Sequence, residues 1–129
     1  MKINSLMTRK DRNEIAAWIV KLSDNVLKRG TTKAGWIPLK YESGPNSVAV
    51  VVSKSDRFSF LIPSTDLRNK AASKGFVPDS IEATSTKPCD KDRYRFKKLS
   101  LSDIQSHESL FREIVKASVR TIMDRRPKN

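Results

Sequence analysis

Hydrophobic and polar residues alternate most regularly in the stretch DRYRFKKLSL, residues 92–101. Tyr94 and Phe96 fall on one side of an extended chain, and three cations fall on the other. Alternation with a period of two is typical of a strand that buries one face. We therefore expect a strand whose aromatic residues fill the core and whose solvent-facing row consists of Arg93, Arg95 and Lys97.

This row of cations has two interpretations. Neighbouring members are roughly 6.6 Å apart along a strand, which suits contact with the evenly spaced phosphates of a nucleic acid. Charged residues also protect exposed edge strands from pairing with other sheets. The strand by itself does not decide between the two interpretations.

Three further extended segments precede the basic strand. The segment 36–41 alternates, with Ile37, Leu39 and Tyr41 on one side, and Pro38 within it predicts an edge strand because proline cannot donate to a ladder. The β-branched run 48–52 fits a central strand. The third segment, 57–62, directs three apolar residues inward, namely Phe58, Phe60 and Ile62. Short connections make these segments an antiparallel meander.

Helical spacing of apolar residues predicts three helices. The first covers 9–28 and ends at Gly30 in a left-handed turn, with a buried stripe of Ile15, Trp18, Ile19, Leu22 and Val26. A short second helix is capped by Ser64 or Thr65 and ends at Gly75 followed by Phe76. The third is capped by Ser102 or Ser106, and its wide apolar face comprises Leu110, Phe111, Ile114, Val115, Ala117, Ser118 and Ile122.

The resulting order is α-β-β-β-α-β-α, which predicts an α+β fold with an antiparallel sheet of about four strands and helices on one face. The 129 residues suffice for a single domain, 1–129, with loose ends at 1–8 and 125–129 and an exposed loop at 77–92. The uncovered face of the sheet then carries, together with the basic row, Trp36, Lys40, Arg57, Ser59 and Leu61.

Composition points toward polyanionic partners. Lys and Arg number 26 against 14 Asp and Glu, a net charge of +12, and such an excess attracts nucleic acids over long distances. No apolar run is long enough for a signal peptide or a membrane span, and the single cysteine excludes an internal disulfide. We expect a cytoplasmic, nucleoid or nuclear protein that is not secreted and has no membrane partner.

Few residues suggest catalysis. Cys89 and His107 form a conceivable nucleophile–base pair without a third member, and Asp90 with Asp92 would hold Mg²⁺ only weakly. The turn 28–33 is either an ordinary helix stop or a phosphate-holding turn. No glycine-rich phosphate loop is present, so we expect no catalytic set, no metal site and no cofactor.

The segment YRFKKLSLSDIQSHESLFREIVKAS, residues 94–118, resembles the last strand and helix of the YjbR/MmcQ-like small bacterial proteins. The shared pattern is an aromatic strand, a polar acidic link and a helix ending in Ala-Ser. The meander departs from that family in its loop lengths and its valine run. The resemblance implies a small α+β domain, for which DNA binding has been suggested and no catalytic set is established.

These observations favour a non-catalytic protein that binds DNA or RNA through phosphate contacts. The sheet face would contribute Trp36, Lys40, Arg57, Arg93, Arg95 and Lys97. A basic side of the last helix would contribute Arg112, Lys116 and Arg120. Two alternatives remain: an interaction or assembly module with an acidic partner, and a small nuclease or toxin using Asp90, Asp92 and His107.

Overall fold

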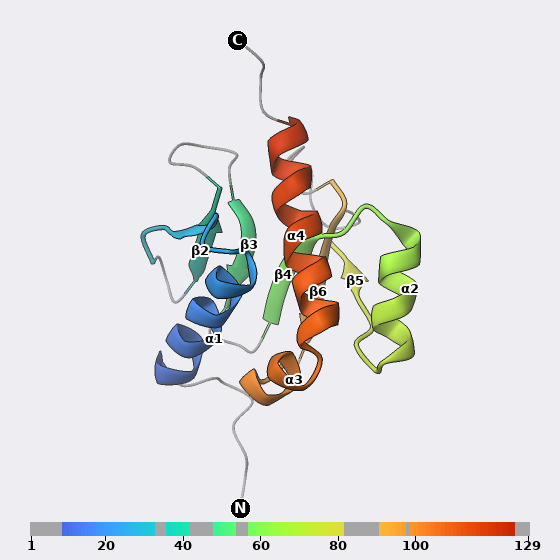
Figure 1. Cartoon of the computed structure of the whole chain (residues 1–129), viewed down its shortest axis with the longest axis horizontal. Coiled ribbons are helices and arrows are strands. Elements are labelled where there is room, and N and C mark those ends of the chain that lie inside the picture. The colour runs from blue at the N-terminus through green and yellow to red at the C-terminus, as the bar shows by residue number, and fades with distance from the viewer. Residues whose placement is uncertain are drawn as a thin grey trace, which may run out of the picture.

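The computed structural model describes residues 9–32, 36–41, 48–53, 57–81, 91–97 and 99–125. Within these residues the chain forms an antiparallel six-stranded sheet and four helices, an α+β fold (Figure 1). The strand order across the sheet is β1-β2-β3-β4-β6-β5. The strands are β1 (Lys28–Arg29), β2 (Ile37–Lys40), β3 (Val48–Val52), β4 (Arg57–Leu61), β5 (Asp79–Ser80) and β6 (Arg93–Lys97). The helices are α1 (Arg9–Leu22), α2 (Thr65–Ser73), α3 (Leu101–Ser106) and α4 (Glu108–Arg125).

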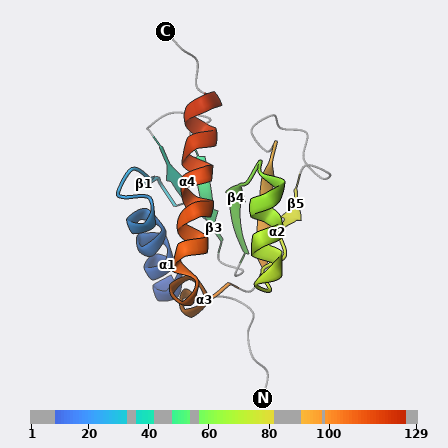
Figure 2. The same ribbon diagram turned by 45° about the vertical axis from the view of Figure 1, so that its right-hand side comes forward.

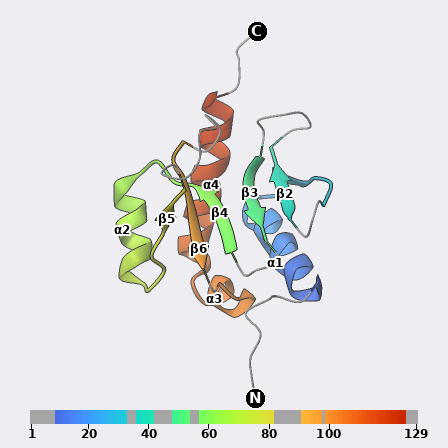
Figure 3. The same ribbon diagram turned by 180° about the vertical axis from the view of Figure 1, so that it is seen from behind.

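The helices lie on one side of the sheet. Viewed from behind, the strands stand in front of α1 and α4 (Figure 3), and α2 lies beside the β5–β6 end (Figure 2). Phe96 of β6 makes edge-to-face contacts with Phe60 of β4 and with Phe111 of α4. The core therefore forms between the helices and the side of the sheet that carries Phe58, Phe60 and Phe96, as the alternation predicted.

The first helix is shorter than predicted, ending at Leu22 rather than residue 28. Asp24 and Asn25 both adopt left-handed backbone conformations, with φ of 59° and 65°, which turn the chain back. Asparagine and aspartate tolerate this conformation better than most residues. The reversal sends Leu27 into the core and leaves Val26, predicted to be buried, 39% exposed.

Gly30 does not act as the left-handed stop that its sequence position suggested, because Gly75 is the only glycine with positive φ among the described residues. Its N–H instead donates to the Pro38 carbonyl at 2.8 Å, continuing the pairing of β1 with β2. A Cβ at this position would meet Lys40 Cδ at 3.0 Å and Pro38 Cγ at 3.1 Å. Gly30 therefore permits a close approach between two strands.

The strand containing Pro38 was predicted to lie at an edge, and this is wrong, since β1 lies outside it. The N–H and C=O of one strand residue point to the same side, and the Pro38 carbonyl faces β1. β1 ends at Arg29, so the N–H that Pro38 lacks would point to a position just beyond the end of β1. The number of strands rises from about four to six because β1 and β5 are both two-residue strands.

The caps of two helices differ in how well the sequence predicted them. Ser64 caps the N-terminus of α2, as predicted. The C-terminus of α2 has the two hydrogen bonds of a Schellman motif, from Gly75 N to Ala72 O and from Phe76 N to Ala71 O. In contrast, Ser100 rather than Ser102 or Ser106 caps the next helix, in a capping box with Asp103. That helix, α3, ends at Ser106 with His107 as its C-cap, and α4 follows directly.

Part of the predicted loop 77–92 is strand, because Asp79 and Ser80 pair with Arg95 and Tyr94. Residues 82–90, including Cys89 and Asp90, lie outside the described residues. The predicted loose ends lie there too, except for Arg125, whose backbone closes α4.

Candidate nucleic-acid interface

The open face of the sheet, away from the helices, carries side chains aligned in rows. Residues directly opposite each other on neighbouring strands share a face. One row consists of Pro38, Val51, Ser59, Arg95 and Asp79, each opposite the next. A second row lies two residues further along each strand and pairs Arg57 with Lys97. The same register, extended through β3, places Trp36 in line with this pair.

Trp36 is the most prominent side chain of the open face. It lies directly before β2 and alternates with the buried Ile37. The residue is 54% exposed, although tryptophan side chains are usually largely buried in folded proteins. Trp36 and Lys97 are three strands apart, roughly 14–15 Å by ordinary strand spacing. Lys40, at the other end of β2, is partly exposed on the same face.

The expectation that Arg93 faces solvent is wrong, since this residue is only 5% exposed. It lies on the open face, opposite Leu61 of β4, but its side chain reaches past β4 to β3. There Nη2 donates to the Val48 carbonyl at 2.8 Å and Nη1 to the Ala49 carbonyl at 3.2 Å. The fork of a guanidinium suits two neighbouring carbonyls, so Arg93 serves the fold.

These carbonyls need a partner because, among the described residues, β3 and β4 pair only at Val51–Ser59 and Val52–Phe58. A register shift in β2 also leaves Ala49 without a directly opposite residue. On the helix side of this split, the Ser118 hydroxyl of α4 accepts from Leu61 N at 3.0 Å and lies 3.1 Å from Leu61 O.

Leu61, expected on the exposed face, is likewise completely buried. It lies opposite Arg93 on β6 and between that residue and β3. A buried leucine at an outward position of β4 shows that this corner of the open face is covered.

Arg95 and Lys97 remain accessible beyond the covered corner. Lys97 is exposed and lies 3.7 Å from the Asp79 carboxylate, in an ion pair whose two side chains are more than half exposed. Such a pair contributes little to stability and is easily exchanged for another anion. Arg95 is partly exposed, and within the described chain its buried Nε has no hydrogen-bond partner. The backbone of Arg57 is opposite Lys97, and its side chain lies outside the description.

The three cations of α4 lie on the opposite side of the molecule from the open face. α4 packs its buried side on β3 and β4, so Arg112, Lys116 and Arg120 point away from the sheet. Asp24 pairs with both Arg112, at 3.4 Å, and Lys116, at 3.3 Å, and Arg112 also contacts Glu108. The two predicted basic surfaces therefore do not converge.

The described residues offer little catalytic chemistry. They contain no cluster of three His, Cys, Asp or Glu side chains that would hold a metal ion. His107 packs edge-on against Phe76, and its Nδ1 lies 3.1 Å from the Asp103 carbonyl, so it caps the end of α3. None of the helices in this part of the chain is long and apolar enough to cross a membrane.

Two shallow grooves were not foreseen from the sequence. One, of about 420 Å³, lies between α1 and β1, and the other, of about 460 Å³, lies between α2 and α4. The sequence Asp24-Asn25 could have indicated the groove between α1 and β1. Both residue types favour the left-handed backbone conformation, which here turns β1 back beneath α1.

Comparison of the chain with protein-family models, with curated proteins and with solved structures finds no match. The resemblance of residues 94–118 to the YjbR/MmcQ-like proteins therefore stays a prediction.

Proposed function

We propose that this protein binds single-stranded nucleic acid through the open face of its sheet. The observation that carries the proposal is the exposed Trp36 on the same face as Arg95 and Lys97. Proteins that bind single strands combine aromatic side chains, on which bases stack, with cations that follow the backbone. A base within a duplex is already stacked, so an isolated exposed indole favours a single strand.

The proposed contact residues are fewer than the sequence suggested. Trp36 stacks on a base, and Lys40, Arg95 and Lys97 contact phosphates. Arg93 is excluded from this set because its guanidinium is already bound to β3 carbonyls. The cations of α4 are also excluded, since they lie on the other side of the sheet from Trp36.

The net charge of +12 supports the same proposal through long-range attraction. It does not select a surface, because an acidic protein partner would be attracted equally. The stacking contribution separates these possibilities. A peptide with several carboxylates provides charge but no row of bases, so its affinity would depend on Arg95 and Lys97 and hardly on Trp36.

The test is a titration of single-stranded and duplex oligonucleotides of equal length, followed by fluorescence anisotropy of a label on the oligonucleotide. We expect Trp36→Ala to weaken single-strand binding by roughly 5- to 150-fold, the range of one base–aromatic stack. Replacing Arg95 and Lys97 by Gln should reduce the slope of log affinity against log salt by about 1.4, as expected for two phosphates of a single strand.

Lys116→Gln is the matched control, since it removes one cation from the opposite side. If Lys116→Gln weakens binding as much as Arg95→Gln while Trp36→Ala has no effect, the open face is not the binding surface. If a glutamate-rich peptide competes as well as the oligonucleotide, the protein belongs with the interaction modules instead.

A further inference from the structure

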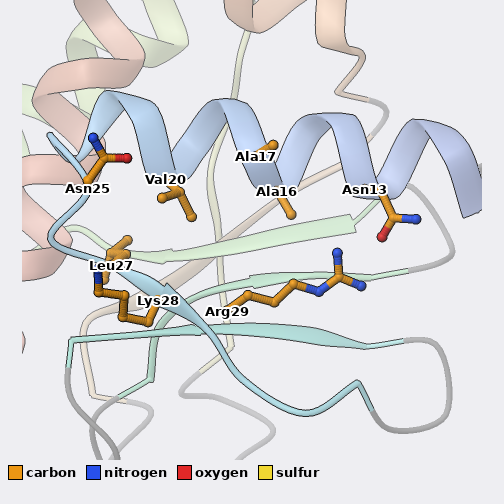
Figure 4. Close-up of a pocket in the computed structure, with 8 residues that line it drawn as sticks. All are labelled: Asn13, Ala16, Ala17, Val20, Asn25, Leu27, Lys28 and Arg29. Atoms are coloured by element: carbon orange, nitrogen blue, oxygen red, sulfur yellow. The ribbon is translucent and has the colours of Figure 1, made fainter.

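The groove between α1 and β1 results from how the chain reverses after the first helix. α1 ends at Leu22, the left-handed residues Asp24 and Asn25 turn the chain, and β1 returns beneath the helix. Figure 4 shows β1 running below α1, with the side chains of Asn13, Ala16 and Val20 directed from the helix toward it. Small side chains on this side of the helix leave a space of about 420 Å³, within the usual size of small-molecule sites.

The lining of this groove separates into an apolar part and a polar part. The apolar part is Ala16, Ala17, Val20 and Leu27, of which Ala17 and Val20 are accessible and Ala16 and Leu27 are buried beneath them. The polar part lies at the two ends: Asn13 and Arg29 face each other at one end, and Asn25 and Lys28 lie at the other (Figure 4). An apolar middle between amide and cationic groups suits a ligand with a flat apolar body, hydrogen-bonding edges and a negative charge.

The groove is free of carboxylates among the described residues that line it, unlike the groove between α2 and α4. In that second groove Lys70 already pairs with Glu113, and Asp66 adds another negative charge. Two acids lie next to lining residues in the sequence: Asp24 is turned toward Arg112 and Lys116 of α4, and Glu14 is exposed and does not line the groove. The positive charge of Arg29 and Lys28 therefore remains available to an anion.

We infer that this groove binds a nucleotide, with the base over the apolar part, its edges at Asn13 or Asn25, and the phosphate at Arg29 or Lys28. An amide side chain offers both a donor and an acceptor, as the edge of a base requires. A carboxylate peptide would use the cations but would leave the amides and the apolar surface without matching groups.

The inference rests on the proposed function and deepens it, because the groove adjoins the open face. Lys28 of β1 is directly opposite Lys40 of β2, a proposed phosphate contact. β1 forms the edge of the sheet, so a strand that crosses the open face past Lys40 reaches the groove there. The nucleotide is therefore either free or part of a bound strand, and the chemistry of the site is the same.

The test follows backbone and asparagine side-chain NMR signals of the full chain during titration with AMP, adenosine and inorganic phosphate. We expect saturable shifts at Asn13, Ala17 and Asn25 with AMP, and weaker binding of adenosine or phosphate alone. Arg29→Gln should weaken AMP binding about tenfold, the usual effect of losing one charge-assisted hydrogen bond.

Ala17→Leu fills the groove and should abolish the AMP shifts. Ala17 is exposed and leucine favours helices, so the fold should survive. Ala117→Leu, in the other groove, is the matched control and should bind AMP normally. If AMP shifts the signals of Trp36 and not those of Asn13 and Asn25, the groove inference is overturned while the proposed function stands.

The inference is also overturned if Ala17→Leu binds AMP with unchanged affinity. It is overturned as well if a glutamate-rich peptide saturates the groove while AMP causes no shifts there. A 5′-phosphorylated oligoadenylate identifies the source of the nucleotide. If it displaces AMP from the wild-type protein and Ala17→Leu weakens it, the nucleotide belongs to a strand. If AMP remains bound while the oligonucleotide occupies the open face, the groove takes free nucleotide. Both of these results support the site.

Discussion

Arg93→Met tests the role that the structure gives to the buried arginine. Methionine preserves much of the side-chain length and removes every donor, so the Val48 and Ala49 carbonyls lose the guanidinium that contacts them. Hydrogen bonds to a charged group contribute about 1.5–3 kcal/mol each, a gross loss of roughly 3–6 kcal/mol. Relief from burying a charge offsets part of this loss, so we expect net destabilisation of about 2–4 kcal/mol.

Urea denaturation followed by circular dichroism measures this change. With a slope of about 2 kcal/mol per molar urea, the unfolding midpoint should fall by roughly 1–2 M. Arg95→Met is the matched control, because Arg95 lies two residues along the same strand, on the same face, and is partly exposed. An exposed substitution of this kind usually changes stability by less than about 0.5 kcal/mol.

Arg93→Lys adds an intermediate case, because an ammonium on a flexible stem does not match two carbonyls as a planar fork does. Its midpoint should fall between those of the wild type and Arg93→Met. The reasoning is refuted if Arg93→Met and Arg95→Met unfold at the same urea concentration, or if Arg93→Met remains stable and loses only nucleic-acid binding.

Two further predictions concern other contacts of the fold. Ser118→Ala leaves the buried Leu61 N–H without the hydroxyl that it contacts, so we expect about 1–3 kcal/mol of destabilisation by urea denaturation, whereas Ser102→Ala at an exposed site should have almost no effect. Gly75→Ala should lower stability by about 1 kcal/mol through its φ of +94° alone, because an added Cβ would meet nothing within 4 Å, and a loss above about 3 kcal/mol would contradict this.

The segments whose burial is decided locally were predictable from the sequence. Phe58 and Phe60 alternate with Arg57 and Ser59 because one side of β4 meets α4, and both phenylalanines are buried as expected. Ser64 and Gly75 are similar cases, since a cap depends on residues within one turn of the helix.

The residues that sequence reasoning placed wrongly depend on partners far along the chain. Arg93 has the same alternation as Lys97, but its side chain reaches β3 carbonyls more than forty residues away in the sequence, and it is buried where Lys97 is exposed. Leu61 was a usable signal, because an apolar residue at an outward position requires a cover. β1 and β5 were missed because two residues are too few for any periodicity.

The split between β3 and β4 also constrains the order in which the protein assembles. Among the described residues, β3 and β4 share only two ladder pairs, and the hydrogen bonds of Arg93 and the packing of α4 on both strands add to the contact between the β1–β2–β3 half and the β4–β6–β5 half. β4 must in addition find β6 across the thirty or so intervening residues, which makes its pairing slower than that of the neighbouring β2 and β3. α4 follows every strand in the chain, so the packing that it adds across the two halves forms only when this helix docks. The sheet should therefore form in two stages, with the amide of Leu61 among the last to become protected from exchange with solvent.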